Sequence, residues 1–505
     1  MLISSREMRA LELNAEYFGV SRLQLMENAG KSVTEEIANR FEPSKERIAI
    51  FCGLGGNGGD GFVIARHLNS LGFQVEVLLA GKHTDISDNE AKKNWAAVES
   101  LKDSLIIYEV YDSSLIPKVK AEVVVDALLG IGLKGAPRPP ILNLIRKINE
   151  IKPFCVAVDV PTGIDADTGR VLGEAVKADL TITFHKLKPG LSQAKGYTGE
   201  IIVKNIGLPQ EFEGFAGPGD VKLVTKPRML EAHKGEFGKI LVIGGSNVFS
   251  GAPFLVASAA LRTGVDLAHI AAPSKTAYAI SSISPNVITI KLEGNHLNPR
   301  NLAAIRPYLE KSTAVAIGPG LGLHKETKGA VKDLVKVVER LKVPLLLDAD
   351  GLKAFAEFKH RVKSPMVFTP HAGEYQILTG KEPPQDLKKR VEEVQKTAQE
   401  LGVTILLKGH RDVISDGRRV KTNFTGNPGM TVGGTGDVLS GIVAAFLAQD
   451  ADPFEAAVAG AFINGAAGDF VQKDKGYHMV PSDLLEWISR LMDDPMLHIK
   501  VRKTL

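Results

Sequence analysis

Short apolar runs alternate with longer amphipathic segments along the whole chain. The short runs are rich in Val, Ile and Leu, which is typical of strands buried on both faces of a sheet. The longer segments repeat apolar residues at helical spacing, which is typical of helices packed on such a sheet. The pattern therefore predicts an α/β protein with parallel sheets covered on both faces. The expected strands are 48–51, 75–79, 123–125, 156–158, 181–184, 201–203, 240–243, 315–317, 345–347, 367–368 and 404–407.

Helices are clearest where the apolar period comes with an end signal. Ser21 and Gln24 form a capping-box pattern before an amphipathic stretch. Residues 331–341 and 391–401 show the same period, and Gly402 after the second is a typical helix stop. These signals predict helices at all three places.

A break in the alternation divides the chain. Residues 207–227 are rich in Gly and Pro and keep no sustained period. We therefore expect a first domain at 1–210, a linker at 211–226 and a second domain at 227–505. The first is expected to be a Rossmann-like, doubly wound parallel sheet, and the second another α/β domain.

Composition narrows the classes of protein. The chain has 505 residues, is 44% apolar, and carries 62 basic against 58 acidic residues. A net charge of +4 gives no electrostatic footprint for nucleic acid. No signal peptide and no apolar run of about 18 residues is present, so we expect a cytoplasmic protein without a membrane partner. Cys52 and Cys155 lie in strand-like runs and are expected as reduced thiols, although one disulfide stays open.

The most informative chemistry lies at residues 429–441, where a glycine-rich turn enters an apolar helix. Glycines and a helix N-terminus together present backbone N–H groups to phosphate. Asp437 at this junction would face phosphate, which suits a base that takes a proton from an attacking hydroxyl. The simpler alternative is that Asp437 is only the N-cap of the helix.

A second glycine-rich loop follows the first expected strand. Gly53, Gly55 and Gly58 satisfy the dinucleotide fingerprint, and Glu76 lies near where a ribose-binding acid would follow. The loop also carries Asn57 and Asp60, which that fingerprint does not need. A Rossmann oxidoreductase is therefore one hypothesis, whereas the missing Gly-Lys-Ser/Thr excludes a P-loop.

Polar residues follow other expected strands of the first domain. Asp126 and Asp159 end two strands, and Thr162 follows shortly after. Because ligands bind at the carboxyl ends of parallel strands, Asn57, Asp126 and Thr162 are expected to converge. Their oxygens suit a cation such as K⁺ or Na⁺. Each residue taken singly has a simpler interpretation as a turn or cap residue.

These motifs resemble two known families in one order along the chain. The first half resembles the NAD(P)HX epimerase domain, and the second resembles the ribokinase-like NAD(P)HX dehydratase domain. Together they resemble bifunctional enzymes that repair hydrated NADH and NADPH. The matching segments are 25–30, 56–61, 126–130 and 159–165 in the first half, and 233–235, 244–246, 318–322, 348–352, 369–374, 408–409 and 433–437 in the second.

The resemblance implies roles in the first half. K⁺ would be bound by Asn57, Asp126 and Thr162, the last where the family usually has Ser. Asp159 would be the general acid/base, and Lys186 or Asp60 could share that task. The residues implied to hold the hydrated dinucleotide are Gly56, Asn57, Gly58, Gly59, Asp60, Gly130, Ile131, Gly132, Leu133, Lys134, Gly135, Ala136 and Asp159.

The resemblance also implies roles in the second half. Asp437 would take the proton of the substrate hydroxyl as that oxygen attacks ADP, and Mg²⁺ would accompany the phosphates. Dinucleotide binding is implied for Gly251, Gly318, His371 and Asp437. ADP binding is implied for Lys408, Gly409, His410, Arg411, Asn427, Pro428, Gly429, Gly433, Gly434, Thr435 and Gly436.

Other hypotheses stay open from the sequence. A second hypothesis is that the second half is an ATP-dependent small-molecule kinase and the first half a silent binding or dimerisation module. The choice of ADP over ATP rests on the resemblance alone. The expected partners are NADHX or NADPHX and ADP, in a homo-oligomer.

Overall fold

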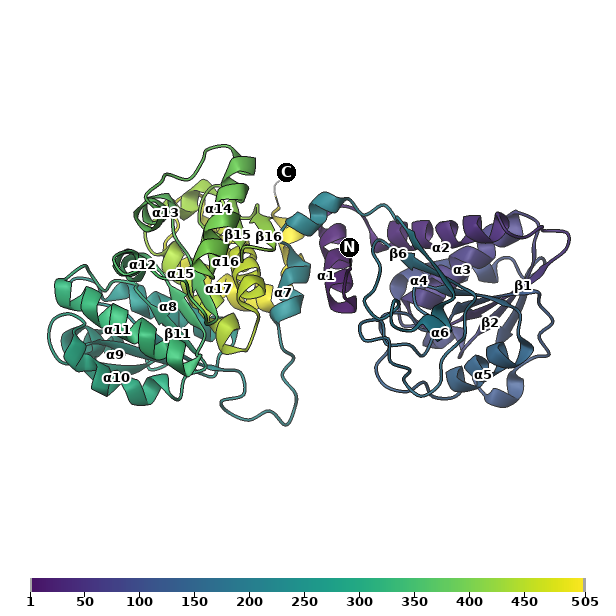
Figure 1. Ribbon diagram of the computed structural model, residues 1–505, viewed down its shortest axis with the longest axis horizontal. Helices are drawn as coiled ribbons and strands as arrows, with labels where there is room; N and C mark the ends of the chain where they lie inside the picture. The colour runs from purple at the N-terminus through teal and green to yellow at the C-terminus, as the bar shows by residue number, and fades with distance from the viewer. Residues whose placement is uncertain (1, 503–505) are drawn as a thin grey trace. The chain divides into compact units, whose positions relative to one another are not determined.

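The alternating segments form two separate sheets, one in each of two units. The computed structural model describes residues 2–502, and its contacts divide the chain into Met1–Phe212 and Glu213–Leu505. Each unit combines a mainly parallel sheet with helices, which confirms the expected α/β class (Figure 1). Within residues 2–502, no helix is long and apolar enough to cross a membrane.

The first unit contains a seven-stranded sheet whose described strands all pair in parallel. The strand order is β3-β2-β1-β4-β5-β6-β7, so the winding direction reverses between β1 and β4. In such sheets, ligands bind beyond the carboxyl ends of the strands at the reversal. The strands are β1 (Arg47–Cys52), β2 (Gln74–Leu79), β3 (Ile106–Glu109), β4 (Val123–Ala127), β5 (Phe154–Val158), β6 (Leu180–Phe184) and β7 (Glu200–Lys204).

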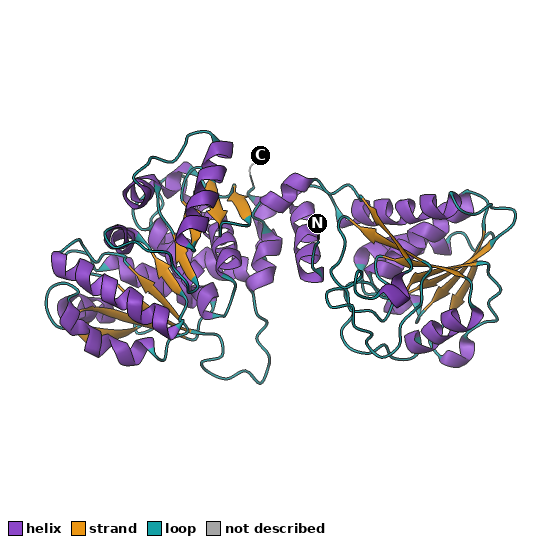
Figure 2. Cartoon of the chain, in the orientation of Figure 1, coloured by secondary structure: helices purple, strands orange, loops and turns teal. Residues whose placement is uncertain are grey.

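Both faces of this sheet are buried under helices (Figure 2). Along β1, Ile48 and Ile50 belong to one apolar cluster, while Ala49 and Phe51 belong to another. This alternation follows from the two-residue period of a strand and explains why β1 is apolar throughout. The helices are α1 (Ser5–Phe18), α2 (Arg22–Ala38), α3 (Gly56–Ser70), α4 (Asn89–Glu99), α5 (Ile141–Ile151) and α6 (Lys195–Thr198).

The second unit contains a nine-stranded sheet in the order β10-β9-β8-β11-β12-β13-β14-β15-β16. Its winding direction reverses between β8 and β11, and β15 and β16 add an antiparallel edge. The strands are β8 (Lys239–Ile243), β9 (Leu267–Pro273), β10 (Ile288–Leu292), β11 (Ala314–Ile317), β12 (Leu345–Leu347), β13 (Met366–Phe368), β14 (Thr404–Leu407), β15 (Asp412–Ser415) and β16 (Val420–Asn423).

Two long helices in this unit are buried almost throughout. The burial of α15 and α16 explains why they are apolar or small all round rather than amphipathic. α15 packs against both α8 and α16. The helices are α7 (Pro218–Val224), α8 (Gly251–Thr263), α9 (Ser274–Ile283), α10 (Leu302–Leu309), α11 (Lys325–Leu341), α12 (Ala349–Ala356), α13 (Ala372–Thr379), α14 (Leu387–Leu401), α15 (Thr435–Ala448), α16 (Pro453–Lys475) and α17 (Pro481–Asp493).

Several local predictions are confirmed. Ser21 caps α2 with the reciprocal Gln24 hydrogen bonds of a capping box. Gly402 ends α14 in the left-handed conformation. The region expected to be irregular differs in one respect, because α7 forms there with buried residues such as Val221 and Val224.

Candidate active sites

The glycine loop of the first unit connects β1 to α3 at the reversal point of the sheet. The loop needs glycine because its backbone packs closely. A Cβ on Gly53 would lie 1.9 Å from the carbonyl oxygen of Leu128, and one on Gly58 would lie 1.9 Å from that of Gly53. α3 starts at Gly56, so its unpaired N–H groups lie at the carboxyl edge of the sheet.

Asp126 and Thr162 meet below this loop. The Thr162 N–H and hydroxyl donate to the two carboxylate oxygens of Asp126, each at 2.7 Å. The N–H of Leu129 donates to the Thr162 hydroxyl at 2.9 Å. A Cβ on Gly130 would lie 3.1 Å from Oδ1 of Asn57. The structure therefore brings all three predicted cation ligands against the segment 128–130.

The Asp126 carboxyl group is buried without a cationic partner. It is fully inaccessible, and burial raises its pKa to about 6 although hydrogen bonds from Thr162 and Leu128 oppose this. Among residues 2–502, no Lys, Arg or His side chain pairs with it, and Nδ2 of Asn57 makes no hydrogen bond. An uncompensated buried carboxylate beside neutral oxygens suits a bound monovalent cation.

Asp159 lies at the end of β5 in an uncommon conformation. Its φ is +64°, a left-handed value that favours glycine, and such residues often mark functional sites. The buried Lys188 donates to its carboxylate at 2.5 Å, and the Thr183 hydroxyl donates at 2.9 Å. Lys188, which the sequence did not single out, thus forms an ion pair with Asp159, while a share of the acid/base task for Lys186 stays a prediction.

A cavity of about 470 Å³ opens beside Asp159 and the glycine loop. Glu12 also faces it, and burial together with the Asp159 carboxylate raises the Glu12 pKa to about 7. Burial and Asp159 likewise raise the pKa of Asp60. The predicted residues that line the cavity are Gly56, Asn57, Asp60, Gly130, Ile131, Gly132, Leu133, Lys134 and Asp159. The lining does not include Gly58, Gly59, Gly135 or Ala136, whereas it does include Arg9, Glu12 and Arg22, which the sequence analysis missed.

Glu76 does not take the position that a Rossmann oxidoreductase needs. It pairs with Ala49 and Ile106 in the middle of β2, and the strand continues to Leu79. A ribose-binding acid would lie at the carboxyl end of this strand. The hypothesis of a Rossmann oxidoreductase therefore loses the ribose-binding acid on which it partly rested.

In the second unit, Asp437 lies in the first turn of α15. The N-cap is Gly434, with φ +105°, so the alternative in which Asp437 caps the helix is wrong. Burial and the carboxylate of Asp348 raise the pKa of Asp437 to about 7, while Lys408 lowers it. A carboxyl group that titrates near neutrality suits general base catalysis.

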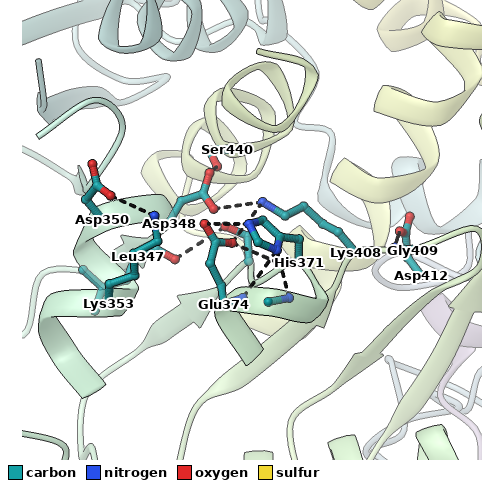
Figure 3. A network of polar contacts seen from close by, with 12 residues as sticks. Leu347, Asp348, Asp350, Lys353, His371, Glu374, Lys408, Gly409, Asp412 and Ser440 are labelled. Atoms are coloured by element: carbon teal, nitrogen blue, oxygen red, sulfur yellow. Dashed lines mark hydrogen bonds and ion pairs between the residues drawn. The ribbon is translucent and has the colours of Figure 1, made fainter. Parts of the chain in front are cut away.

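Charged side chains that act on Asp437 form a cluster of Asp348, Glu374 and Lys408 (Figure 3). Nζ of Lys408 lies 3.0 Å from Asp348 and 3.9 Å from Glu374, and the Ser440 hydroxyl donates to Asp348 at 2.7 Å. A Cβ on Gly436 would lie 3.3 Å from Nζ of Lys408. Lys408 is thus placed between the glycine turn and two buried carboxylates.

Gly318 directly follows β11 and His371 comes shortly after β13, on either side of β12 in the sheet. Nδ1 of His371 accepts the Gly373 N–H at 3.0 Å, which caps α13, and its own N–H donates to Glu374. Gly318, with φ +135°, has no room for a side chain, because a Cβ would lie 1.8 Å from the Asp348 carbonyl oxygen. Both residues therefore border the charged cluster.

The loop before the glycine turn is held by hydrogen bonds to the buried carboxylate of Asp469. Asp469 of α16 accepts the Gly426 N–H at 2.9 Å and Nδ2 of Asn427 at 3.0 Å. His498 contacts the same carboxylate at 3.1 Å. The other side-chain atom of Asn427, Oδ1, accepts the Gly429 N–H. This hydrogen bond caps the 3₁₀ turn Pro428–Thr431. Neither Asp469 nor His498 was singled out from the sequence.

The remaining predicted residues differ in their surroundings. Gly409, His410 and Arg411 are exposed, and the Arg411 guanidinium stacks on Phe424 at 4.9 Å from the ring centre. Gly251 is the exposed first residue of α8. The Thr435 hydroxyl donates to the Met430 carbonyl oxygen at 2.7 Å and so closes the glycine turn.

Comparison with known proteins identifies similar chains for both units. The family model described as NAD(P)H-hydrate dehydratase matches residues 240–490, and the model described as YjeF-related protein N-terminus matches residues 22–190. A Pyrobaculum aerophilum protein named bifunctional NAD(P)H-hydrate repair enzyme Nnr is 47% identical over 97% of this chain and 98% of that protein. Its namesake from Methanothermobacter thermautotrophicus is 42% identical over 96% and 94%.

Solved structures are similar to part of the chain. The structure of ADP/ATP-dependent NAD(P)H-hydrate dehydratase from Bacillus subtilis, co-crystallised with ATP and Mg²⁺, is 26% identical, with a TM-score of 0.48. The match covers 56% of this chain and 98% of that one.

Proposed function

The chain belongs to the family of bifunctional NAD(P)H-hydrate repair enzymes, and from this premise we propose how its two sites act. The first unit would interconvert the R and S forms of hydrated NADH and NADPH. The second would use ADP to dehydrate the S form, releasing AMP and phosphate. The observation that carries the proposal is Asp437, a carboxyl group with a pKa near 7 in the first turn of α15.

Asp437 would act on the hydroxyl of the hydrated nicotinamide ring. Hydroxide is a poor leaving group, so the hydroxyl must first be converted. As Asp437 takes its proton, the oxygen would attack the terminal phosphoryl of ADP, and the bond to the AMP oxygen would break. The ring nitrogen lone pair would then expel phosphate, and loss of a proton from the adjacent carbon would restore the double bond.

The start of α15 would stabilise the phosphoryl group. Its first N–H groups, at Thr435 and Gly436, lack partners within the helix and carry partial positive charge. Loss of one such donor typically costs about 2.7–4 kcal/mol of barrier. The carboxylates of Asp348 and Glu374 offer the hard oxygen ligands that fit Mg²⁺, which would neutralise phosphate charge when bound.

In the first unit we propose Asp159 as the general acid/base. Its position in the cavity and its left-handed backbone support this role, and Lys188 fixes the orientation of its carboxylate. Glu12 faces the same cavity with a pKa of about 7 and is the nearest alternative. Asn57, Asp126 and Thr162 would hold K⁺, which would supply the missing countercharge of Asp126 and orient substrate phosphate.

The test is repair of an R/S mixture of hydrated NADH by the full chain with K⁺ and Mg²⁺. Recovery of dihydronicotinamide absorbance is followed with ADP or ATP, alongside a chain with Asp159→Asn that reports spontaneous epimerisation. Complete recovery with ADP supports both activities. Recovery of the S fraction alone would remove the epimerase proposal, and no recovery with either nucleotide would remove the dehydratase proposal.

The alternative of an ATP-dependent small-molecule kinase is not favoured, because the family model that matches residues 240–490 is described as a dehydratase. ADP rather than ATP as phosphoryl donor remains part of the proposal. A homo-oligomer and a cytoplasmic location remain predictions, which sedimentation and cell fractionation would test.

A further inference from the structure

Three metal-binding side chains meet away from both proposed catalytic centres. Nε2 of His296 lies 2.7 Å from Oε2 of Glu326, and Nδ1 of His324 lies 3.8 Å from the same oxygen. One ligand atom of each residue lies within 4.8 Å of the others, and the two imidazole centres are 3.9 Å apart. His296 comes from the loop after β10, whereas His324 and Glu326 come from the start of α11.

We propose that His296, His324 and Glu326 bind one divalent transition-metal ion such as Zn²⁺ or Co²⁺. Two imidazoles and a carboxylate are a common ligand set for such ions. With metal–ligand distances near 2.1 Å, two ligands of a tetrahedral ion lie about 3.4 Å apart. The separations of 2.7 and 3.8 Å bracket this value, so side-chain rotations would bring the ligands onto one ion. Nδ1 of His324 accepts the Glu326 N–H at 3.3 Å as the N-cap of α11, and an ion bound at this nitrogen would replace that hydrogen bond.

The two segments that carry the ligands are already fixed to their surroundings. The Asn295 carbonyl oxygen accepts the Asn247 N–H at 3.1 Å, and the Leu297 carbonyl oxygen accepts the buried Thr327 hydroxyl at 2.9 Å. The loop therefore has little freedom to lose when an ion binds, which favours affinity. The bound ion would cross-link the loop after β10 to the start of α11. It would also restrict the motion of residues 318–324, which connect β11 to α11.

The site has an open side toward solvent. The side chains of His296, Glu326 and His324 are 28%, 49% and 55% exposed. An ion can thus reach the ligands without unfolding, and water can fill its remaining position. The nitrogen-rich ligand set also separates this site from the Mg²⁺ proposed at the phosphates, because Mg²⁺ prefers oxygen ligands.

The test uses the untagged full chain, freed of metal with a chelator and then titrated with Co²⁺ or Zn²⁺ alone. The d–d absorption of Co²⁺ and equilibrium dialysis of Zn²⁺ report binding. We expect His324→Ala and Glu326→Gln each to weaken this binding by at least about tenfold. The matched control is His360→Ala, which removes an imidazole from another exposed pair, 3.0 Å from Glu339.

The number of ions bound by each variant, and the affinity for them, distinguish a metal site at these three residues from binding elsewhere. Loss of one bound equivalent in both variants, with binding retained in the control, supports the site. Unchanged stoichiometry and affinity in His296→Ala and His324→Ala would overturn it. Displacement of Co²⁺ by an equal concentration of Mg²⁺ would also overturn it, since the ligand set assigns a transition metal. Circular dichroism of every variant checks the fold, since His324→Ala also removes the N-cap acceptor of α11.

Discussion

The surroundings of Asp437 make its charge sensitive to neutral pH. Burial and Asp348 raise its pKa to about 7. Since a general base must be ionised, kcat/KM for dehydration should fall about tenfold per pH unit below the pKa.

Asp437→Asn should lower turnover by about 10²–10⁴-fold while ADP still binds, as kinetics and calorimetry would measure. Asp450→Asn just beyond the same helix is the control, and near-normal turnover in Asp437→Asn contradicts the role.

The same raised pKa predicts a cost in stability. The carboxyl of Asp437 has an ordinary pKa of 3.8 and a folded pKa of about 7. Between these values the folded state binds more protons than the unfolded state, so this group lowers stability as pH rises. Asp437→Asn should therefore gain about 0.5–2 kcal/mol of unfolding free energy at pH 8. Denaturant titration should show this gain shrinking toward pH 4, and a loss of stability at pH 8 would refute the explanation.

Asp126 gives a prediction for K⁺. A bound cation would favour its ionised form, whose pKa burial now raises to about 6. Above this pH, K⁺ should stabilise the chain by about 2.7 kcal/mol at about 100 times Kd. Thermal melting in K⁺ against tetramethylammonium measures the effect, and Asp126→Asn should abolish it. Equal stabilisation of that variant would place the cation elsewhere.

Site residues at strand ends were predicted from the sequence, whereas residues that reach the site from distant segments were not. Asp126 and Thr162 follow strand ends in a parallel sheet, so topology alone indicates that they meet, and they do. Lys188 reaches Asp159 from a later loop, and Glu12 reaches the cavity from the first helix. No local period signals such distant contacts, because they depend on how the elements pack.

Among the elements, the loop before α15 depends on Asp469 of α16. Its carboxylate binds Gly426 and Asn427 and so positions the segment proposed to bind ADP. Asp469→Asn should raise KM for ADP about tenfold, since each hydrogen bond to a charged group contributes about 1.5–3 kcal/mol, while kcat changes little. Asp474→Asn on the same helix is the control. A fall in kcat with unchanged KM would contradict a positioning role.

The central strands were predicted better than the edge strands. Strands such as β8 and β11 are buried on both faces and therefore read as continuous apolar runs. The prediction missed β3 and β10, which are short, pair on one side only and are partly exposed, and also β15 and β16. It missed β9 because Ala and His interrupt the apolar run. Helix ends were predicted well where a cap residue signals them, as at Ser21.

Over the whole molecule, each proposed site is built from residues of one unit. Asp159 contacts Lys188 and Thr183 within the first unit, and Asp437 faces Asp348 and Lys408 within the second. Asp159→Asn should therefore lose epimerisation alone, and Asp437→Asn dehydration alone. Mixing the two variants should restore complete repair of the R/S mixture, as absorbance recovery would measure. Failure of the mixture, with each remaining activity intact, would show that one chain must carry both sites.

Because one polypeptide carries both units, the two proposed sites are always present in equal numbers. Every translated copy supplies equal numbers of both sites, so a change in expression alters both in the same proportion. Given a mixture of R and S hydrates, too little epimerase would leave behind the form that the proposed dehydratase does not use. The fusion makes this imbalance impossible at the level of gene dosage, and leaves only the turnover rates of the two sites to decide which epimer persists.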